Sequence, residues 1–249
     1  MSGHYRQPTL LPEANMTAIA NWSEETDAEH GEVFTRRWVV DLILDMAGYT
    51  ADLDLASKRV VEPSCGGGAF ISAIVERLLA SAKAHNHDFE ALANSLLAFD
   101  LLGHNVEISR KTAAVELVSA GCDEPLARSL AESWIRSSDF LLEEHEERSA
   151  DFVIGNPPYI RLEDVPNEVS EEYRRRWPTM KGRADIFIGF YEKGLSLLKP
   201  EGKLAFICAD RWMRNQYGGT LRKLIADRYA MDSVVVMHDV DAFEEQVSA

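Results

Sequence analysis

The residues best suited to chemistry are Asn156, Pro157, Pro158 and Tyr159, which follow the apolar run Asp151–Gly155. Such a run predicts a buried strand of a parallel sheet. Each proline fixes its own φ angle and pushes the preceding residue towards extended geometry. The pattern predicts a stiff loop, carrying an amide and an aromatic side chain, at the carboxyl end of a strand, where open α/β sheets bind ligands. These residues also fit an ordinary loop after a strand without any chemical role, because X-Pro commonly ends secondary structure.

A second candidate site is the glycine-rich segment Pro63–Gly68, which lies between a predicted strand at Lys58–Glu62 and a long amphipathic helix that ends near Ala84. Strand, glycine turn and helix let a ligand approach the backbone closely at a helix N-terminus. The segment is neither a G-x-G-x-x-G fingerprint nor a phosphate loop, which would end in Gly-Lys-Ser/Thr. Glu62, directly before the turn, strengthens the prediction of a ligand site.

Acidic residues also mark the ends of the next strands. Asp100 ends the predicted strand Leu96–Phe99, where a carboxylate can accept from vicinal ribose hydroxyls. Asp139 fits a third position at the same edge, where it could accept from an adenine amino group while Phe140 packs on the ring. A helix-capping role for Asp100, and a surface position for Asp139 beside a core phenylalanine, also fit the sequence.

Strands and helices alternate along the chain, which predicts an α/β fold with a doubly wound, mostly parallel sheet and helices on both faces. Helical spacing of apolar residues predicts helices over Val33–Ala47, Val106–Val118, Pro125–Arg136, Ile186–Leu198 and Trp212–Arg228. Further strands are predicted over Lys203–Cys208 and, as the sixth, Ser233–Met237. Thr35 is expected to cap its helix or to face a ligand, and Asp185 to cap the helix that follows it. The charged, aperiodic stretch Arg161–Lys181 is long enough for a functional lid or substrate loop.

Composition limits the class of protein. A chain of 249 residues with 46% hydrophobic content can form one α/β domain, and residues 1–30 are expected to form a mobile arm. No apolar run is long enough to span a membrane and none follows a charged leader, so we expect a soluble, cytoplasmic protein. The cysteines and histidines lack metal-ligand spacing, so we expect a reducing compartment and no metal.

The net charge of −15 opposes a nucleic-acid partner, because phosphate neutralisation needs a basic face. The charge is unevenly spread, however, and basic residues gather after Tyr159. They are Arg161, Arg174, Arg175, Arg176, Lys181 and Arg183. Such a cluster either contacts phosphate groups or forms an ordinary solvated face.

In their order along the chain, these segments resemble the N6-adenine-specific DNA methyltransferases, and most closely the gamma-ordered group of TaqI-like and Eco57I-like enzymes. The matching segments are G-E-V-F-T at Gly31–Thr35, V-E-P-S-C-G-G-G-A-F at Val61–Phe70, A-F-D at Ala98–Asp100, S-D-F at Ser138–Phe140, N-P-P-Y at Asn156–Tyr159, L-L-K-P-E-G-K-L-A-F-I at Leu197–Ile207 and A-F-E-E-Q-V-S-A at Ala242–Ala249. The glycine turn and N-P-P-Y are highly specific together. Two residues depart from the pattern, since Arg36 stands where the family commonly has Pro and Gly67 where it often has Ser.

The resemblance implies a Rossmann-like class I methyltransferase fold over residues 31–249, with S-adenosylmethionine as methyl donor. The donor-binding residues it implies are Thr35, Glu62, Pro63, Ser64, Cys65, Gly66, Gly68, Phe70, Asp100, Asp139 and Phe140. Asp100 would hold the ribose, and Asp139 with Phe140 the adenine ring. Thr35 would hold the methionine carboxylate.

The family normally continues into a last strand and a target-recognition domain, and both are expected to be missing from residues 31–249. We therefore expect a catalytic core that is a fragment, or one partner of a split enzyme. Such a core needs a specificity partner and binds DNA weakly alone.

The resemblance also assigns catalysis to Asn156, Pro157, Pro158 and Tyr159. An adenine amino nitrogen is a poor nucleophile because its lone pair is delocalised into the ring. Two acceptors on its N–H groups, the Asn156 side-chain oxygen and the Pro157 carbonyl, favour a pyramidal nitrogen aimed at the sulfonium methyl, without a strong base. Tyr159 and Phe243 would face the two sides of an adenine flipped out of the DNA duplex.

Two other functions stay open. Protein-glutamine and RNA N-methyltransferases use the same N-P-P-Y loop, and the acidic net charge favours them. Their glycine turn usually reads Asp/Glu-x-Gly-x-Gly-x-Gly, however, which Glu62–Gly66 does not. A non-catalytic, methyltransferase-like binding subunit is the second alternative, and the intact Asn156 argues against it. We therefore expect a site-specific adenine DNA methyltransferase of a restriction-modification or related system.

Overall fold

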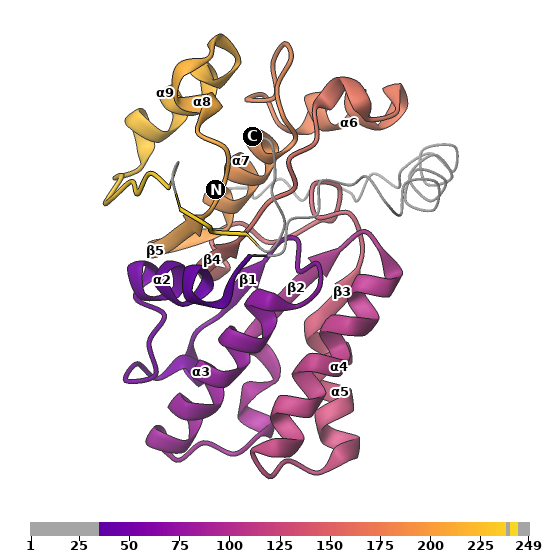
Figure 1. Cartoon of the computed structure of the whole chain (residues 1–249), viewed down its shortest axis with the longest axis vertical. Helices are drawn as coiled ribbons and strands as arrows, with labels where there is room; N and C mark the ends of the chain where they lie inside the picture. The colour runs from indigo at the N-terminus through magenta and orange to yellow at the C-terminus, as the bar shows by residue number, and fades with distance from the viewer. Residues whose placement is uncertain (1–34, 238–239, 244–249) are drawn as a thin grey trace, which may run out of the picture.

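Five parallel strands form one sheet in the computed structural model, which describes residues 35–237 and 240–243 (Figure 1). The strands are β1 (Val60–Glu62), β2 (Leu96–Asp100), β3 (Ile135–Ser137), β4 (Ala150–Gly155) and β5 (Leu198–Phe206). Their order is β3-β2-β1-β4-β5, and every neighbouring pair is parallel. The strand order reverses at β1, so the predicted doubly wound, parallel sheet is confirmed.

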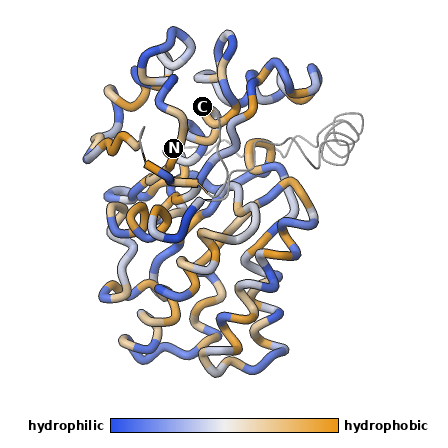
Figure 2. Tube along the Cα trace, viewed as in Figure 1, coloured by the Kyte–Doolittle hydropathy of each residue, from blue (hydrophilic) through white to orange (hydrophobic). Residues whose placement is uncertain are grey.

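Helices cover both faces of the sheet, because successive side chains of a strand point to opposite sides. Val60 packs into one apolar cluster and Val61 into a second. The first cluster contains buried residues of α2 (Arg37–Ala47), α3 (Ala69–His85), α4 (Gly103–Ser119) and α5 (Glu124–Trp134). The second contains buried residues of α6 (Asn167–Arg176), α7 (Phe187–Leu197), α8 (Arg211–Arg214) and α9 (Gly219–Arg228). Figure 2 shows hydrophobic and hydrophilic stretches alternating along these helices, as expected where only one side of a helix is buried.

Short 3-10 helices lie in four of the connections. They are η1 (Leu55–Ser57), η2 (Glu90–Asn94), η3 (Leu162–Asp164) and η4 (Gln216–Gly218). The loops that follow β1, β2, β3 and β4 meet at one edge of the sheet, because parallel strands end on the same side. This carboxyl edge holds the glycine turn, the acidic residues and the N-P-P-Y segment.

The prediction of a sixth strand at Ser233–Met237 is wrong, since the structure has no strand there. Val234, Val235 and Val236 are 49%, 52% and 60% exposed. No described strand pairs with this segment. An isolated strand leaves its backbone hydrogen-bonding groups to water, so β-branched composition alone does not produce one.

Several boundaries also differ from the sequence-based expectation; β5, for example, covers Leu198–Phe206 instead of Lys203–Cys208. The helix predicted over Pro125–Arg136 ends at Trp134, and Ile135 begins β3 instead. Ile135 is fully buried and pairs with Ala98 of β2, so the sheet ends the helix. The stretch Arg161–Lys181, predicted to be aperiodic, contains η3 and α6.

The cap predicted at Asp185 is wrong, and of the two alternatives for Thr35 the helix cap is wrong too. Arg36 occupies the N-cap position of α2, and Ile186 that of α7, both without a side-chain cap. Thr35 instead forms an antiparallel bridge with Phe243, and the Asp185 carboxylate accepts from the Tyr217 hydroxyl at 2.9 Å. Both residues thus contact segments far away in the sequence.

The arm predicted over residues 1–30 lies outside the described residues, as does Gly31–Phe34. Within the described ranges, no helix combines the length and apolar character needed to cross a membrane. The same ranges hold no cluster of three His, Cys, Asp or Glu side chains that could bind a metal ion.

Candidate active site

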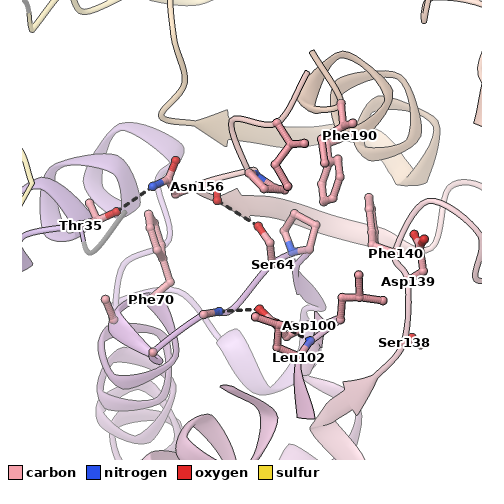
Figure 3. Close-up of a pocket in the computed structure, with 18 of the residues that line it drawn as sticks. Thr35, Ser64, Phe70, Asp100, Leu102, Ser138, Asp139, Phe140, Asn156 and Phe190 are labelled. Atoms are coloured by element: carbon pink, nitrogen blue, oxygen red, sulfur yellow. Dashed lines mark hydrogen bonds between the residues drawn. The ribbon is translucent and has the colours of Figure 1, made fainter. Parts of the chain in front are cut away.

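A cavity opens at the carboxyl edge of the sheet, among the loops after β1, β2, β3 and β4 (Figure 3). Its volume, including space open to solvent, is about 940 Å³, which suits a small-molecule ligand. The predicted site residues that line it are Thr35, Pro63, Ser64, Gly66, Phe70, Asp100, Asp139, Phe140, Asn156 and Pro158. Five separate segments of the chain therefore meet at one cavity, as their positions at strand ends predict.

The turn after β1 has a backbone shape that favours glycine. Gly66 and Gly68 have φ angles of 45° and 84°, in the left-handed region. A Cβ on Gly68 would also lie 3.2 Å from Ser109 Oγ, whose hydroxyl donates to the Gly66 carbonyl at 3.0 Å. Gly68 is the N-cap of α3, so the first turn of that helix begins beside the cavity with free N–H groups. This arrangement can hold a polar or anionic group of a ligand.

Asp100 directs its carboxylate at the glycine turn. One oxygen accepts from the Gly66 N–H at 2.8 Å, and the other accepts from the Leu102 N–H at 2.9 Å and from Asn105 Nδ2 at 3.2 Å. Burial raises the pKa of Asp100, and these hydrogen bonds oppose the rise. The N-cap of α4 is Leu102, so Asp100 does not cap that helix. Its remaining lone pairs can accept from ligand hydroxyl groups in the cavity.

Asp139 and Phe140 line the end of the cavity that lies away from Thr35 and Asn156 (Figure 3). One Asp139 oxygen accepts from the Leu141 N–H at 2.8 Å and the other from the Tyr173 hydroxyl at 2.5 Å. Burial raises the pKa of Asp139, and the Tyr173 hydrogen bond opposes the rise. The rings of Phe140 and Phe190 lie 5.2 Å apart, centroid to centroid, which creates an apolar wall for a flat ring.

Hydrogen bonds with Thr35, Ser64 and Tyr159 hold Asn156, and the first two are drawn in Figure 3. Its Nδ2 donates to Thr35 Oγ1 at 3.2 Å, and its backbone carbonyl accepts from the Ser64 hydroxyl at 3.0 Å. The third bond comes from the Tyr159 hydroxyl, which donates to Asn156 Oδ1 at 2.7 Å. These contacts join the N-P-P-Y segment to the glycine turn and to Thr35.

Glu62 lies behind the turn and is fully buried. Its Oε1 accepts from the Ser64 N–H at 3.2 Å, and no group among the described residues donates to its Oε2. Burial raises the pKa of Glu62 well above its ordinary value. A Cβ on Gly155 would overlap Oε1, so Glu62 packs directly between the glycine turn and the end of β4.

Some predicted site residues do not line the cavity. They are Glu62, Cys65, Gly68, Pro157, Tyr159 and Phe243. Tyr159 packs edge-on against Phe187, with ring centroids 6.3 Å apart. The Phe243 carbonyl accepts from Arg36 Nε at 3.0 Å, which gives a structural use to the residue that departs from the family pattern. The contact of Tyr159 or Phe243 with a target base stays a prediction.

The basic cluster divides into two groups. Arg174 donates to two backbone carbonyls of the loop after α6, while Arg175 and Arg176 both pair with Glu172. These three side chains therefore stabilise the α6 region itself. Of the remaining basic side chains, all exposed, Arg161 and Arg183 pair with Glu163 at 3.8 and 3.5 Å, while Lys181 lies in the loop after α6.

Sequence reasoning missed much of the apolar and aromatic lining. These residues are Ala69, Leu101, Leu102, Ile160, Tyr173, Ile186 and Phe190. Leu101 could have been found, because it directly follows the strand-end acid Asp100. Phe190 belongs to a helix predicted over Ile186–Leu198 and Tyr173 to a stretch predicted to be aperiodic, and neither residue has a local signal for a ligand site.

A doubly wound parallel sheet with this cavity at its carboxyl edge is the Rossmann-like fold of class I methyltransferases. Residues 76–243 match the Eco57I restriction-modification methylase family. The chain belongs to this family, which confirms the resemblance read from its motifs.

Two curated relatives extend the match towards the N-terminus. The chain is 45% identical over 223 residues to the Type II methyltransferase M.PaeR7I of Pseudomonas aeruginosa, covering 88% of this chain and 38% of that protein. It is 39% identical over 223 residues to M.XhoI of Xanthomonas vasicola, covering 88% of this chain and 41% of that protein. The chain thus spans well under half the length of these relatives.

Solved structures support the fold alone, at low identity. DrdV, in its complex with DNA, superposes with a TM-score of 0.56 at 16% identity, covering 86% of this chain and 25% of DrdV. The M protein of the Type I restriction enzyme EcoKI gives a TM-score of 0.52 at 14% identity, covering 83% of this chain and 40% of that one.

Proposed function

We propose that this chain transfers a methyl group from S-adenosylmethionine to the N6 amino group of adenine in DNA, as part of a restriction-modification or related system. The observation that carries the proposal is the placement of Asn156. Its side chain is held from both ends at the wall of a cavity whose far end carries Asp139 and Phe140. Family membership and the relatives named above support methyl transfer.

The cavity residues fit an adenosyl donor. Asp100 presents a carboxylate for the ribose hydroxyls, and Asp139 presents one for an adenine amino group, beside the apolar wall of Phe140 and Phe190. The N-terminus of α3 and the Thr35 hydroxyl suit the amino-acid end. S-adenosylmethionine supplies a sulfonium-bound methyl group when it occupies such a site.

The chemistry assigned to Asn156 and Pro157 is positioning rather than strong base catalysis. Asn156 Oδ1 and the Pro157 carbonyl would accept from the two N–H groups of the target amine, which turns its lone pair towards the donor. Oδ1 already accepts from the Tyr159 hydroxyl, but an amide oxygen has two lone pairs and can accept a second bond. The Ser64 hydroxyl holds the Asn156 backbone, so donor turn and acceptor segment keep a fixed separation.

For the target base, we propose that Tyr159 stacks on one face and Phe243 supports the other. Phe243 forms a backbone bridge with Thr35, and Thr35 bonds the Asn156 side chain, so Phe243 lies on a segment beside the amide. The Tyr159 ring is half-buried and packs edge-on against Phe187. The exposed Arg161, Lys181 and Arg183 are the proposed phosphate contacts.

Sequence recognition is proposed to reside outside this chain, in a further domain or a specificity partner. The chain covers 38% and 41% of two relatives, and its net charge of −15 is unfavourable for DNA binding by itself. Electrophoretic mobility shifts with duplex DNA test this point. Weak binding without sequence preference is expected, and tight sequence-specific binding by this chain would contradict it.

The second candidate function is N-methyl transfer to protein glutamine. Its support is the net charge of −15, together with the use of Arg174, Arg175 and Arg176 within the α6 region. Labelled methyl transfer to duplex DNA, RNA and protein extracts separates the candidates, with Asn156→Ala as the matched variant. Label in DNA, lost in the variant, is expected. Label in protein alone would favour the second candidate, and label in none of the three would support a non-catalytic binding subunit.

A further inference from the structure

One face of α6 holds the loop that follows β3. Tyr173, Arg176 and Trp177 are three and four residues apart, so they project from the same side of the helix and its C-terminal cap. The Tyr173 hydroxyl donates to the Asp139 carboxylate at 2.5 Å. Arg176 Nη1 donates to the Leu142 carbonyl at 2.5 Å, and Trp177 Nε1 to the Leu141 carbonyl at 2.9 Å. The segment predicted to be a lid is therefore attached to the cavity wall.

Tyr173 differs from its two neighbours because it also lines the cavity. It is 2% exposed, and its partner Asp139 is the carboxylate at the adenine end of the proposed donor site. A hydroxyl that donates to a carboxylate at this distance forms a strong, charge-assisted hydrogen bond. The Leu141 N–H holds the second Asp139 oxygen at 2.8 Å. Two donors from two elements thus set the plane of one carboxylate.

A carboxylate has about four lone pairs that can accept hydrogen bonds. The bonds from Tyr173 and Leu141 therefore leave lone pairs that can accept from a ligand in the cavity. The two oxygens turn together about the Cβ–Cγ bond, so the direction of the remaining lone pairs depends on the Tyr173 bond together with the backbone N–H bonds of the loop after β3. The hydrogen bond also favours the ionised form, opposing the burial that raises the pKa of Asp139. An ionised, oriented acceptor recognises an amino group and rejects a carbonyl oxygen at the same place.

We propose that Tyr173 is a positioning residue of the donor site, which orients Asp139 for the exocyclic amino group of an adenosyl ligand and so makes α6 a determinant of adenine selectivity. The inference rests on the proposed function, because it needs the cavity to bind an adenosyl group. It goes beyond that function by assigning ligand selectivity to a helix outside the strand-end motifs.

Calorimetric titration of the whole chain with two ligands tests the proposal. The first is S-adenosylhomocysteine, and the second is S-inosylhomocysteine, which carries a ring carbonyl in place of the amino group. The wild type is expected to prefer the adenosyl ligand at least about tenfold. Tyr173→Phe keeps the ring but removes the donor, and should weaken the adenosyl ligand by roughly tenfold with little effect on the inosyl ligand.

A matched control exists in Tyr217, whose hydroxyl donates to Asp185 at 2.9 Å outside the cavity lining. Tyr217→Phe removes a similar Tyr–Asp bond and should leave the preference between the two ligands unchanged. A cycle with Asp139→Ala adds a second readout. Once Asp139 is gone, Tyr173→Phe should have no further effect on adenosyl binding, because the two residues act as a unit.

The outcomes separate this inference from the proposed function. If the wild type binds S-adenosylhomocysteine and Tyr173→Phe leaves the preference unchanged, the role of Tyr173 is refuted while the donor site stands. Equal weakening of both ligands would refute it too, since that result indicates a structural role only. If the wild type binds neither ligand, both the donor site and the inference are overturned.

Discussion

The end of β4 and the glycine turn are in direct contact at Gly155, and substitution of this glycine gives the sharpest test of how the site is built. Gly155 immediately precedes Asn156, and a Cβ there would overlap Glu62 Oε1 and lie 3.2 Å from Pro63 Cδ. Glu62 is fully buried and bonded to the Ser64 N–H, so it cannot swing away into solvent. In Gly155→Ala, either the turn or the Asn156 segment must move.

The size of the effect follows from that contact. Restoring an ordinary atomic separation requires a shift of about 1 Å. Overpacking of this kind costs roughly 1–3 kcal/mol of stability, or about 2–4 °C in Tm for each kcal/mol. A misplacement of about 1 Å between reacting groups costs roughly 100-fold in rate. Turnover should therefore fall far more than stability.

The assay is single-turnover methyl transfer to duplex DNA at saturating donor, combined with thermal unfolding of Gly155→Ala. Gly219→Ala is the control, because a Cβ there meets only Arg222 Nη2 at an ordinary 3.7 Å. We expect a roughly 100-fold slower reaction for Gly155→Ala and a near-normal one for the control. A Gly155→Ala protein with wild-type rate and Tm would refute the account of how the turn and the acceptor segment are held together.

Three further predictions concern the same region. In Asp100→Ala, loss of the carboxylate that accepts from Gly66 and Leu102 should weaken S-adenosylhomocysteine at least about tenfold by calorimetry; unchanged affinity would contradict its role in the donor site. Ser64→Ala removes the bond to the Asn156 carbonyl and should slow transfer about fivefold in single-turnover assays, and an undiminished rate would argue against this coupling. Burial lowers the pKa of Lys193 to about 7, whereas an unfolded lysine keeps its proton to about pH 10. Between about pH 7 and 9 the unfolded state therefore binds more protons, so the free energy of unfolding rises with pH. Urea unfolding should show this rise in the wild type relative to Lys193→Met, and parallel pH profiles would contradict it.

The order of the elements and the strand-end motifs could be predicted because their signals are local. An apolar run followed by Asn156 and two prolines, or a strand followed by three glycines, is readable within ten residues or so of sequence. The parallel sheet then brings such ends together, which is why Asp100, Asp139 and Asn156 were placed correctly at one edge. Helix and strand alternation suffices for that step.

The rest of the site depends on contacts between distant segments. Tyr173 belongs to a charged helix with no ligand motif, and only its bond to Asp139 reveals its place in the cavity. Thr35 fits a helix cap by its position, but its hydroxyl bonds a side chain 121 residues away. At Ser233–Met237 a local signal was present but misleading. Its valines favour a strand, yet they stay exposed because no described strand pairs with them.

The central claim is that Asn156 directs methyl transfer to the N6 position of adenine in DNA. Nucleoside mass spectrometry of duplex DNA incubated with this chain and S-adenosylmethionine tests it most directly. The account predicts N6-methyladenine, and its loss in an Asn156→Ala variant that still binds S-adenosylhomocysteine. Methylated cytosine, or N6-methyladenine formed at an undiminished rate by Asn156→Ala, would contradict it.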